Sequence, residues 1–329
     1  MLLSTWVQRT CAGHDSPLMT TATSVPSTRD ELEGDEALET LRGAGVRRLA
    51  LDTIARFRGA DGFSHSRALA FQSTLALLPA LIAIVGLAAA LDQDAFRRVV
   101  QATIEDLAPG AVGEILTDAL RQGRTAAGQE SGETALAGGG IAALIAGTTA
   151  MAQIERGANR IYGVERDRPF MRKYLVALTL ALTAGTLAFT AFVVLLGGSA
   201  IRASVGFGET LEGIWRIGRW PLGLAAVVCA VALLFEYAPR RRQPEASWLA
   251  FGAALSALLW LLFMALLALY IGATDSFGAT YGPVAGTIGV LLWAYLTSIA
   301  LFVGLAFAAQ LEAVRAGVAS PRVEREENV

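Results

Sequence analysis

The chain has little of the residue types that build most catalytic and metal-binding sites. Its 329 residues include two histidines, two cysteines and one lysine, Lys173. Cys11 lies in a polar tail and Cys229 in an apolar run, so the two cysteines make no disulfide framework. No H-x-x-x-H, C-x-x-C, G-x-S-x-G or phosphate-loop pattern occurs, and His65 stands alone. The sequence therefore predicts no enzyme, no cofactor and no metal site.

Charge is also scarce, because only 17% of the residues are charged while 54% are hydrophobic. A soluble domain carries about 25% charged residues. The deficit is uneven, since long windows without charge alternate with short charged segments, as in proteins that cross a membrane several times. The expected partner is thus the lipid bilayer. The formal net charge of −2 points to no nucleic-acid partner, and both a homo-oligomer and the substrate are left open.

Six apolar runs are long enough to cross the hydrocarbon, which takes roughly 20 residues. They predict an all-α, polytopic bundle over residues 43–315, with spans at about residues 68–91, 134–152, 174–198, 215–237, 248–272 and 283–309. Residues 1–42 are polar and predict a disordered cytoplasmic tail. Residues 43–58 predict a basic amphipathic helix at the membrane interface, with its arginines facing the headgroups. Residues 92–133 predict an amphipathic extracytoplasmic segment, and residues 316–329 a second cytoplasmic tail.

The orientation follows from the arginines and lysine in the short connections. The second-to-third loop holds six basic residues and the fourth-to-fifth loop holds three adjacent arginines, whereas the fifth-to-sixth loop holds none. Basic residues also precede the first span and follow the last. Six spans place all these segments on one side, so both termini are predicted to be cytoplasmic; five or seven spans would scramble the pattern.

Polar groups in the spans are the candidates for a transport pathway or a hinge. Gln72 and Pro79 lie in the first span, and proline leaves a carbonyl unpaired in the preceding turn. Threonines in the spans are expected to bond to their own helix. Near the cytoplasmic ends stand Glu236, Gln310 and Glu312.

Two of these features have simpler alternatives. Glu236 precedes Arg240 by four residues, so a local ion pair is the alternative to a pathway role. Gly139, Ala143 and Gly147 form a column of small residues in the second span, which lets helices approach closely in lipid. Chance from an alanine- and glycine-rich composition is the alternative for this column.

Several segments resemble the YihY/virulence factor BrkB family over about residues 45–315. They are Asp61-Gly62-Phe63-Ser64 with Leu78-Pro79, Asn159-Arg160-Ile161-Tyr162-Gly163 followed by Arg168-Pro169-Phe170, and Tyr281-Gly282-Pro283-Val284-Ala285-Gly286 with Trp293-Ala294-Tyr295-Leu296. The last span typically closes in a Gly-Ala-Glu-Leu-Asn-like segment. Here it keeps a Gln310-Leu311-Glu312 ending and lacks the earlier glutamate.

The resemblance implies a six-span protein of the bacterial plasma (inner) membrane. Members were once labelled ribonucleases, and this sequence lacks the histidine and aspartate cluster of a metal-dependent nuclease. The leading interpretation is a non-enzymatic protein that transports a small solute or lipid, or maintains the envelope. A membrane scaffold that recruits partners through its cytoplasmic loops is the alternative, and a ribonuclease is a further one.

Overall fold

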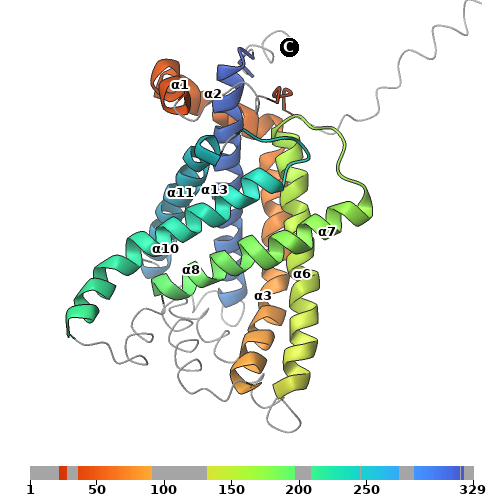
Figure 1. The fold of residues 1–329 in the computed structure, drawn as a ribbon, viewed down its shortest axis with the longest axis vertical. Helices are drawn as coiled ribbons and strands as arrows, with labels where there is room; N and C mark the ends of the chain where they lie inside the picture. Colours follow the sequence, from red (N-terminus) through yellow and green to blue (C-terminus); the bar gives the residue numbers. More distant parts are fainter. Residues whose placement is uncertain are drawn as a thin grey trace, which may run out of the picture.

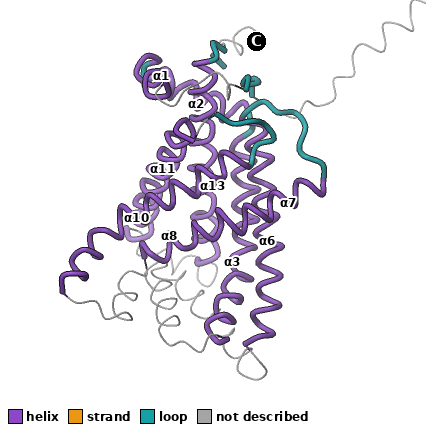
Figure 2. Tube along the Cα trace, in the orientation of Figure 1, coloured by secondary structure: helices purple, strands orange, loops and turns teal. Residues whose placement is uncertain are grey.

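The computed structural model describes residues 22–27, 36–90, 132–196, 209–244, 246–273, 285–318 and 320–321. All regular structure within these ranges is helical (Figure 2). The predicted extracytoplasmic segment lies outside the described residues, apart from its last two positions, as do most of the C-terminal tail and the Tyr281–Val284 part of the resemblance.

The described helices follow the apolar runs of the sequence. They are α1 (Glu36–Ala44), α2 (Val46–Gly59), α3 (Gly62–Ala90), α6 (Gly132–Ile161), α7 (Phe170–Leu180), a π-helical segment (Ala181–Gly185), α8 (Thr186–Leu196), α10 (Glu209–Tyr237), α11 (Ala246–Ala273) and α13 (Ala285–Arg315). Helices predominate because every backbone polar group in hydrocarbon must be bonded within its own segment.

Five segments of the described chain are long and apolar enough to cross a membrane. They are Leu136–Ile161, Phe170–Ala191, Gly213–Tyr237, Trp248–Tyr270 and Thr287–Arg315. The predicted first span falls in α3, a helix of 29 residues that continues past Pro79. The sixth crossing stays a prediction.

Two spans extend further than their hydropathy predicts. Helix α6 continues from the predicted end at residue 152 to Ile161, and α13 continues from residue 309 to Arg315. The apolar windows end where charged and amide side chains begin. The backbone nevertheless stays helical there, because these polar side chains form hydrogen bonds and ion pairs with other segments of the chain. Gln310 and Glu312 therefore lie on a continuous helix.

The long helices pack in a closed order around the bundle. Helix α3 lies along α6 on one side and contacts α13 on the other; α13 packs on α11, α11 on α10, and α10 on α8. Helix α7 and the π-helical segment return to α6 and close the ring. Figure 1 shows α3 and α6 side by side, with α7–α8 and α10 crossing the bundle at a slant.

Glycines permit the closest helix contacts. A Cβ atom on Gly252 of α11 would lie 2.6 Å from the carbonyl oxygen of Gly304 on α13, so the two backbones touch there. A Cβ on Gly139 of α6 would lie 2.8 Å from the backbone nitrogen of Ala83 on α3. The other members of the predicted small-residue column are less confined. Gly147 would meet only the Cβ of Ala181 at 3.8 Å, an ordinary contact, and Ala143 is half-buried.

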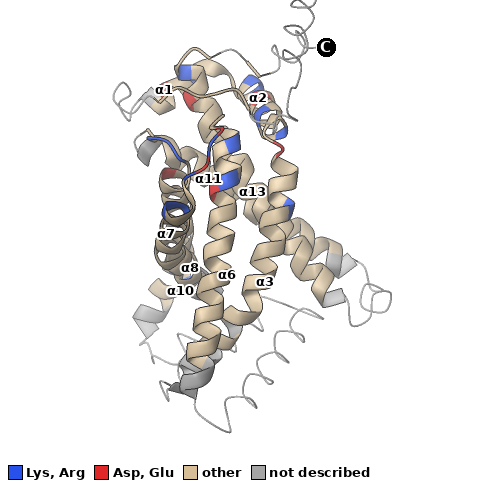
Figure 3. Cartoon of the chain, turned by 90° about the vertical axis from the view of Figure 1, so that its right-hand side faces the viewer, with Lys and Arg blue, Asp and Glu red and all other residues tan. Residues whose placement is uncertain are grey.

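Charged residues gather at the end of the bundle that carries α1, α2 and the last turn of α13 (Figure 3). We call this the charged end; it also holds the 162–169 loop and the 238–244 loop. The basic segments that the sequence assigns to the cytoplasm therefore meet on one side, as the predicted orientation requires.

The prediction of a disordered tail over residues 1–42 is wrong for two stretches. Residues 22–27 lie against the charged end, where the Ala22 and Val25 amides donate to the carbonyls of Arg160 and Tyr162 at 3.0 and 3.1 Å. Helix α1 begins at Glu36. A polar composition indicates too little apolar surface for a core of its own. It does not reveal backbone partners that another part of the chain supplies.

Helix α2 also departs from its prediction. Arg47, Arg48 and Arg58 are exposed, as an interfacial helix requires. Arg56, in contrast, is fully buried together with Leu49 and Phe57, because α2 packs on α13 and α3.

Candidate functional site

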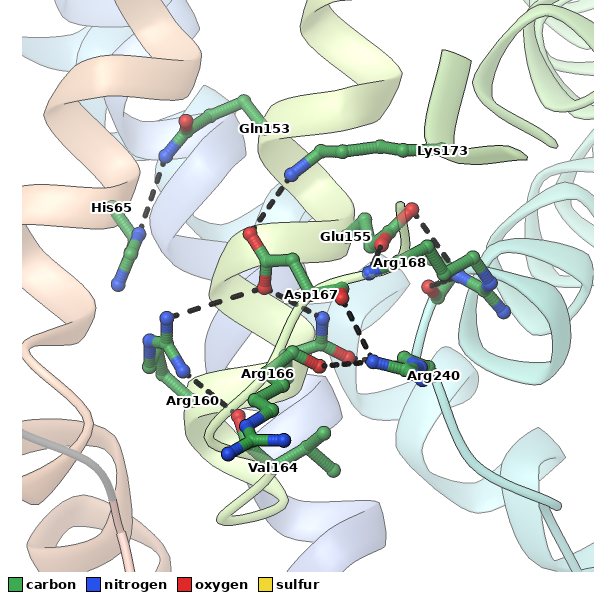
Figure 4. Close-up of polar contacts among 12 residues, drawn as sticks. His65, Gln153, Glu155, Arg160, Val164, Arg166, Asp167, Arg168, Lys173 and Arg240 are labelled. Atoms are coloured by element: carbon green, nitrogen blue, oxygen red, sulfur yellow. Dashed lines mark hydrogen bonds and ion pairs between the residues drawn. The ribbon is translucent and has the colours of Figure 1, made fainter. Parts of the chain in front are cut away.

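The first polar cluster of the charged end is built around Asp167 in the loop after α6 (Figure 4). Asn159 Nδ2 donates to one carboxylate oxygen at 2.9 Å and Lys173 Nζ to the other at 2.9 Å. Arg160 Nη2 lies 4.0 Å away. Burial alone would raise the pKa of Asp167, but the hydrogen bonds from Asn159 and Lys173 outweigh it and lower the pKa below its ordinary value. This carboxylate therefore holds the loop while charged.

Asn159 also joins this loop to the loop after α10. Its side-chain oxygen accepts a hydrogen bond from the Arg240 backbone amide at 2.7 Å. The Arg240 guanidinium donates to the carbonyls of Asp167 and Arg166 at 2.9 and 3.4 Å. The described side-chain contacts of Arg240 therefore go to the 162–169 loop and not to Glu236. Glu236 itself is half-buried.

Arg168 ties the same loop to the end of α10. Its guanidinium donates to the carbonyls of Tyr237, Ala238 and Pro239 at 3.1, 2.6 and 2.8 Å. These carbonyls lie at the helix C-terminus, where acceptors lack partners and the partial charge is negative. Glu155 on α6 balances the arginine, with 3.2 Å between Glu155 Oε2 and Arg168 Nη1.

A second cluster is held by Arg241 and Glu312. The two side chains form a bidentate pair with N–O distances of 2.8 and 2.7 Å, and they are 7% and 1% exposed. Arg241 also donates to the Pro26 carbonyl at 2.9 Å and lies 4.5 Å from the centre of the Tyr162 ring. Burial, with the Glu312 charge as a further cause, raises the pKa of Tyr162.

Arg56 forms the matching contact beside it. Its Nε donates to Gln310 Oε1 at 2.8 Å, and its Nη1 donates to the carbonyls of Thr23 and Ile161 at 2.8 and 3.1 Å. Gln310 and Glu312 are two of the candidate pathway residues near the cytoplasmic ends of the spans. The structure buries both side chains, and each is bonded to an arginine from another segment of the chain.

Gly163 lets the N-terminal segment reach these arginines. Its φ of 73° is a left-handed conformation that suits glycine. A Cβ there would lie 2.5 Å from Ser24 Cα, inside the docked segment. The motif Asn159–Gly163 thus supplies contacts to both clusters.

A tight corner between α2 and α3 places His65. Asp61 has a φ of 50°, and a Cβ on Gly62 would collide with the Phe57 ring. His65 Nδ1 lies 3.2 Å from Gln153 Nε2 on α6. Burial, the largest cause, lowers the pKa of His65. Burial therefore favours the neutral ring over the charged one.

Sequence reasoning missed the partners at the charged end. It assigned Arg56 to the membrane surface and did not single out Glu155, Asp167 or Arg241. One signal was present: Glu155 and Asp167 are carboxylates inside a strongly basic segment, which is a common sign of paired rather than solvated charges.

Within the described residues, the bundle and its charged end define an all-helical, multi-pass membrane protein. This class agrees with the predicted plasma-membrane location. The sequence model of the virulence factor BrkB family matches residues 53–328, and the chain belongs to this family.

Relatives support the same assignment. YfkH of Bacillus subtilis (strain 168), described as ribonuclease-like, is 27% identical over 260 residues, covering 77% of this chain and 91% of its own. UPF0761 membrane proteins of Chromobacterium violaceum and Aromatoleum aromaticum are 28% and 30% identical, over 75% and 74% of this chain. The match spans just over half of those two relatives, 57% and 58% of their length. No solved structure matches the chain.

Proposed function

We propose that this protein transports a small polar solute or the polar part of a lipid across the membrane, and that it is not an enzyme. One observation carries the proposal. The side-chain oxygens of Gln72 on α3 and Thr297 on α13 are buried within the bundle, and no described residue hydrogen-bonds to them. A polar group at membrane depth without a protein partner is energetically costly. Its presence therefore favours a hydrogen bond to a substrate that crosses the membrane.

The other hydroxyl groups in the spans set these two apart. Seven of them donate to carbonyls three or four residues earlier in their own helix: Thr74, Thr148, Thr149, Thr179, Thr183, Thr190 and Ser298. This is the ordinary solution for a hydroxyl in a membrane helix. Thr297 does not adopt it, although its neighbour Ser298 does.

The unpartnered oxygens of Gln72 and Thr297 lie at a similar height along the bundle. The rings of His65 on α3 and Phe302 on α13 lie 6.4 Å apart and so define which turns of these helices face each other. The helices are antiparallel (Figure 1) and each rises about 1.5 Å per residue. Gln72 is therefore level with about residue 295 of α13, within a turn of Thr297.

Irregular helices around the bundle fit the same function. Pro79 lies about two turns beyond Gln72 inside α3, where we propose that it serves as a hinge. The third crossing is interrupted by the π-helical segment Ala181–Gly185, a feature that often marks functional positions. We further propose that the Arg241–Glu312 and Arg56–Gln310 contacts are a closed gate that transport must open.

Flux into liposomes tests this proposal. The purified chain is reconstituted with panels of labelled small solutes and headgroup-labelled lipids, and Gln72→Leu and Thr297→Val are compared with Thr190→Val as the control. Loss of one hydrogen bond to the passing group predicts flux reduced roughly tenfold in the first two variants. Thr190→Val removes a hydroxyl already bonded to its own helix, so its flux stays near that of the parent chain. Equal flux in all three variants, for a substrate that the parent chain transports, argues against this pathway.

A membrane scaffold is the second candidate, and the outer face of α2 favours it. Val46, Leu51 and Ile54 are exposed there at the charged end, next to exposed arginines. An apolar and basic face suits either lipid or a protein partner. Crosslinking from this face in cells, with Ile54→Asp as the comparison, distinguishes the two. Absence of any reproducible protein partner removes the scaffold candidate.

The ribonuclease label of a relative brings a third candidate. Among the described residues, no group of three or more histidine, cysteine, aspartate or glutamate side chains is placed to hold a metal ion. A direct assay of the purified chain with RNA and divalent cations tests this candidate, and cleavage that survives repurification would support it.

A further inference from the structure

A basic pocket opens beside the first turn of α7. Its volume is about 350 Å³, and its lining comprises Arg168, Pro169, Arg172, Val176 and Arg240. We infer that this pocket binds the phosphate group of an anionic membrane lipid. The inference goes beyond the transport proposal and does not depend on it.

Positive charge in this region exceeds what the described acids balance. Residues 155–173 together with Arg240 contain seven basic and three acidic side chains. Asp167 forms an ion pair with Lys173, and Glu155 forms an ion pair with Arg168. Within the described residues, no carboxylate pairs with Arg172 or Arg240, and both side chains are exposed. Two guanidinium groups at the pocket thus retain donors for an anion.

The start of α7 adds to this potential. Its first turn contains no acid, whereas Arg172 and Lys173 both lie within it. Backbone N–H groups at a helix N-terminus carry a partial positive charge, so basic side chains there are unfavourable. The carboxylate of Asp167 neutralises the charge of Lys173. For Arg172, an external anion supplies the missing counter-charge, and phosphate oxygens accept the hydrogen bonds of a guanidinium well.

The surroundings point to a lipid as the source of the phosphate. Phe170, Met171 and Leu175 of α7 are 71%, 78% and 65% exposed. Helix α7 also begins the crossing Phe170–Ala191, so the pocket lies where a span meets the membrane surface. An acyl chain would cover these apolar side chains while the headgroup occupies the pocket. Basic pockets at the cytoplasmic side of membrane helices recognise anionic headgroups in this way.

Native mass spectrometry of the full chain in neutral detergent tests the inference. Phosphatidylglycerol and phosphatidylcholine are titrated separately, and lipid-bound and free protein are quantified. Each basic residue near an anionic surface contributes about 1 kcal/mol, or about fivefold in affinity. Arg172→Gln should therefore weaken phosphatidylglycerol binding about fivefold, and Arg172→Gln with Arg240→Gln about 25-fold. Arg42→Gln, which removes the same charge from an exposed position on α1, should change it less than about twofold.

Two further arms separate the alternatives. The double Lys variant of Arg172 and Arg240 keeps both charges and should retain most of the binding, which shows that a loss in the Gln variants is not misfolding. Inorganic phosphate at the same concentration as the lipid should leave the lipid bound, because it offers no acyl chain. Full displacement by inorganic phosphate would instead identify a free-phosphate site. Equal affinity of the parent chain and the double Gln variant for phosphatidylglycerol, or equal binding of phosphatidylcholine, overturns the inference.

Discussion

Replacing Glu312 with leucine or Arg241 with methionine should each destabilise the protein strongly. The pair is bidentate and its members are 1% and 7% exposed, so removal of one partner leaves a buried charge without compensation. Such losses cost about 3–5 kcal/mol. Because both side chains are almost fully buried, water does not screen the charge that remains.

The double variant distinguishes a buried pair from two independent contacts. Replacing both partners with apolar side chains removes the charge together with its desolvation penalty. The remaining cost is that of the Arg241 hydrogen bond to Pro26 and its contact with Tyr162, about 1–3 kcal/mol in all. The double variant should therefore be more stable than either single variant.

Unfolding free energies in mixed micelles, titrated with a denaturing detergent, provide the measurement. Arg58→Met, an exposed arginine on α2, serves as the control and should change stability by less than about 0.5 kcal/mol. A double variant whose cost equals the sum of the two single costs, about 6–10 kcal/mol, would refute the reasoning.

Three further predictions use the same unfolding assay. Gly163→Ala places a Cβ against Ser24 at a φ of 73°, so it should cost about 1–3 kcal/mol and make residues 22–27 accessible to protease. Gly139→Ala should destabilise by about 1–3 kcal/mol, because its Cβ meets the α3 backbone at 2.8 Å, whereas Gly140→Ala, with nothing within 4 Å, should not. The pKa of His65 is lowered in the folded chain, so the unfolded chain binds a proton at this histidine more readily. The contribution of His65 to the free energy of unfolding is therefore complete above pH 6.5 and is lost as the pH falls below 6.5 toward the folded pKa.

Each of these predictions has a result that contradicts it. A Gly163→Ala variant with parental protease resistance would show that the segment does not need the glycine. Equal stability of the two neighbouring alanine variants on α6 would remove the argument for close packing there. His65→Asn should flatten the stability profile below pH 6.5, and an unchanged slope would assign the pH dependence to other groups.

The helices were largely predictable because apolar content is a local property. Each of the five crossings that the structure describes overlaps a predicted span. Their ends were less predictable. Hydropathy stops at residue 152 in α6 and at residue 309 in α13, yet both helices continue, because Glu155, Asn159 and Glu312 obtain partners from other elements.

The candidate site was predictable only in part. Gln310 and Glu312 stood out as polar residues at the end of an apolar run, but their partners did not. Gln310 bonds to Arg56 across 254 positions and Glu312 to Arg241 across 71. Sequence spacing reveals neighbours within a helical turn, and it proposed Arg240 for Glu236 on that basis. The structure assigns Arg240 to the 162–169 loop instead.

The sequence by itself determined the class of protein, its expected orientation and its family, because each depends on composition, charge asymmetry or motifs that are read along the chain. Only the tertiary structure decided which arginines are buried, that residues 22–27 are docked, and that Arg168, Arg172 and Arg240 share a pocket. The physical reason is that these contacts join segments far apart in sequence. Their charges look alike along the chain, and burial beside a particular partner is what makes one arginine structural and another free to bind a ligand.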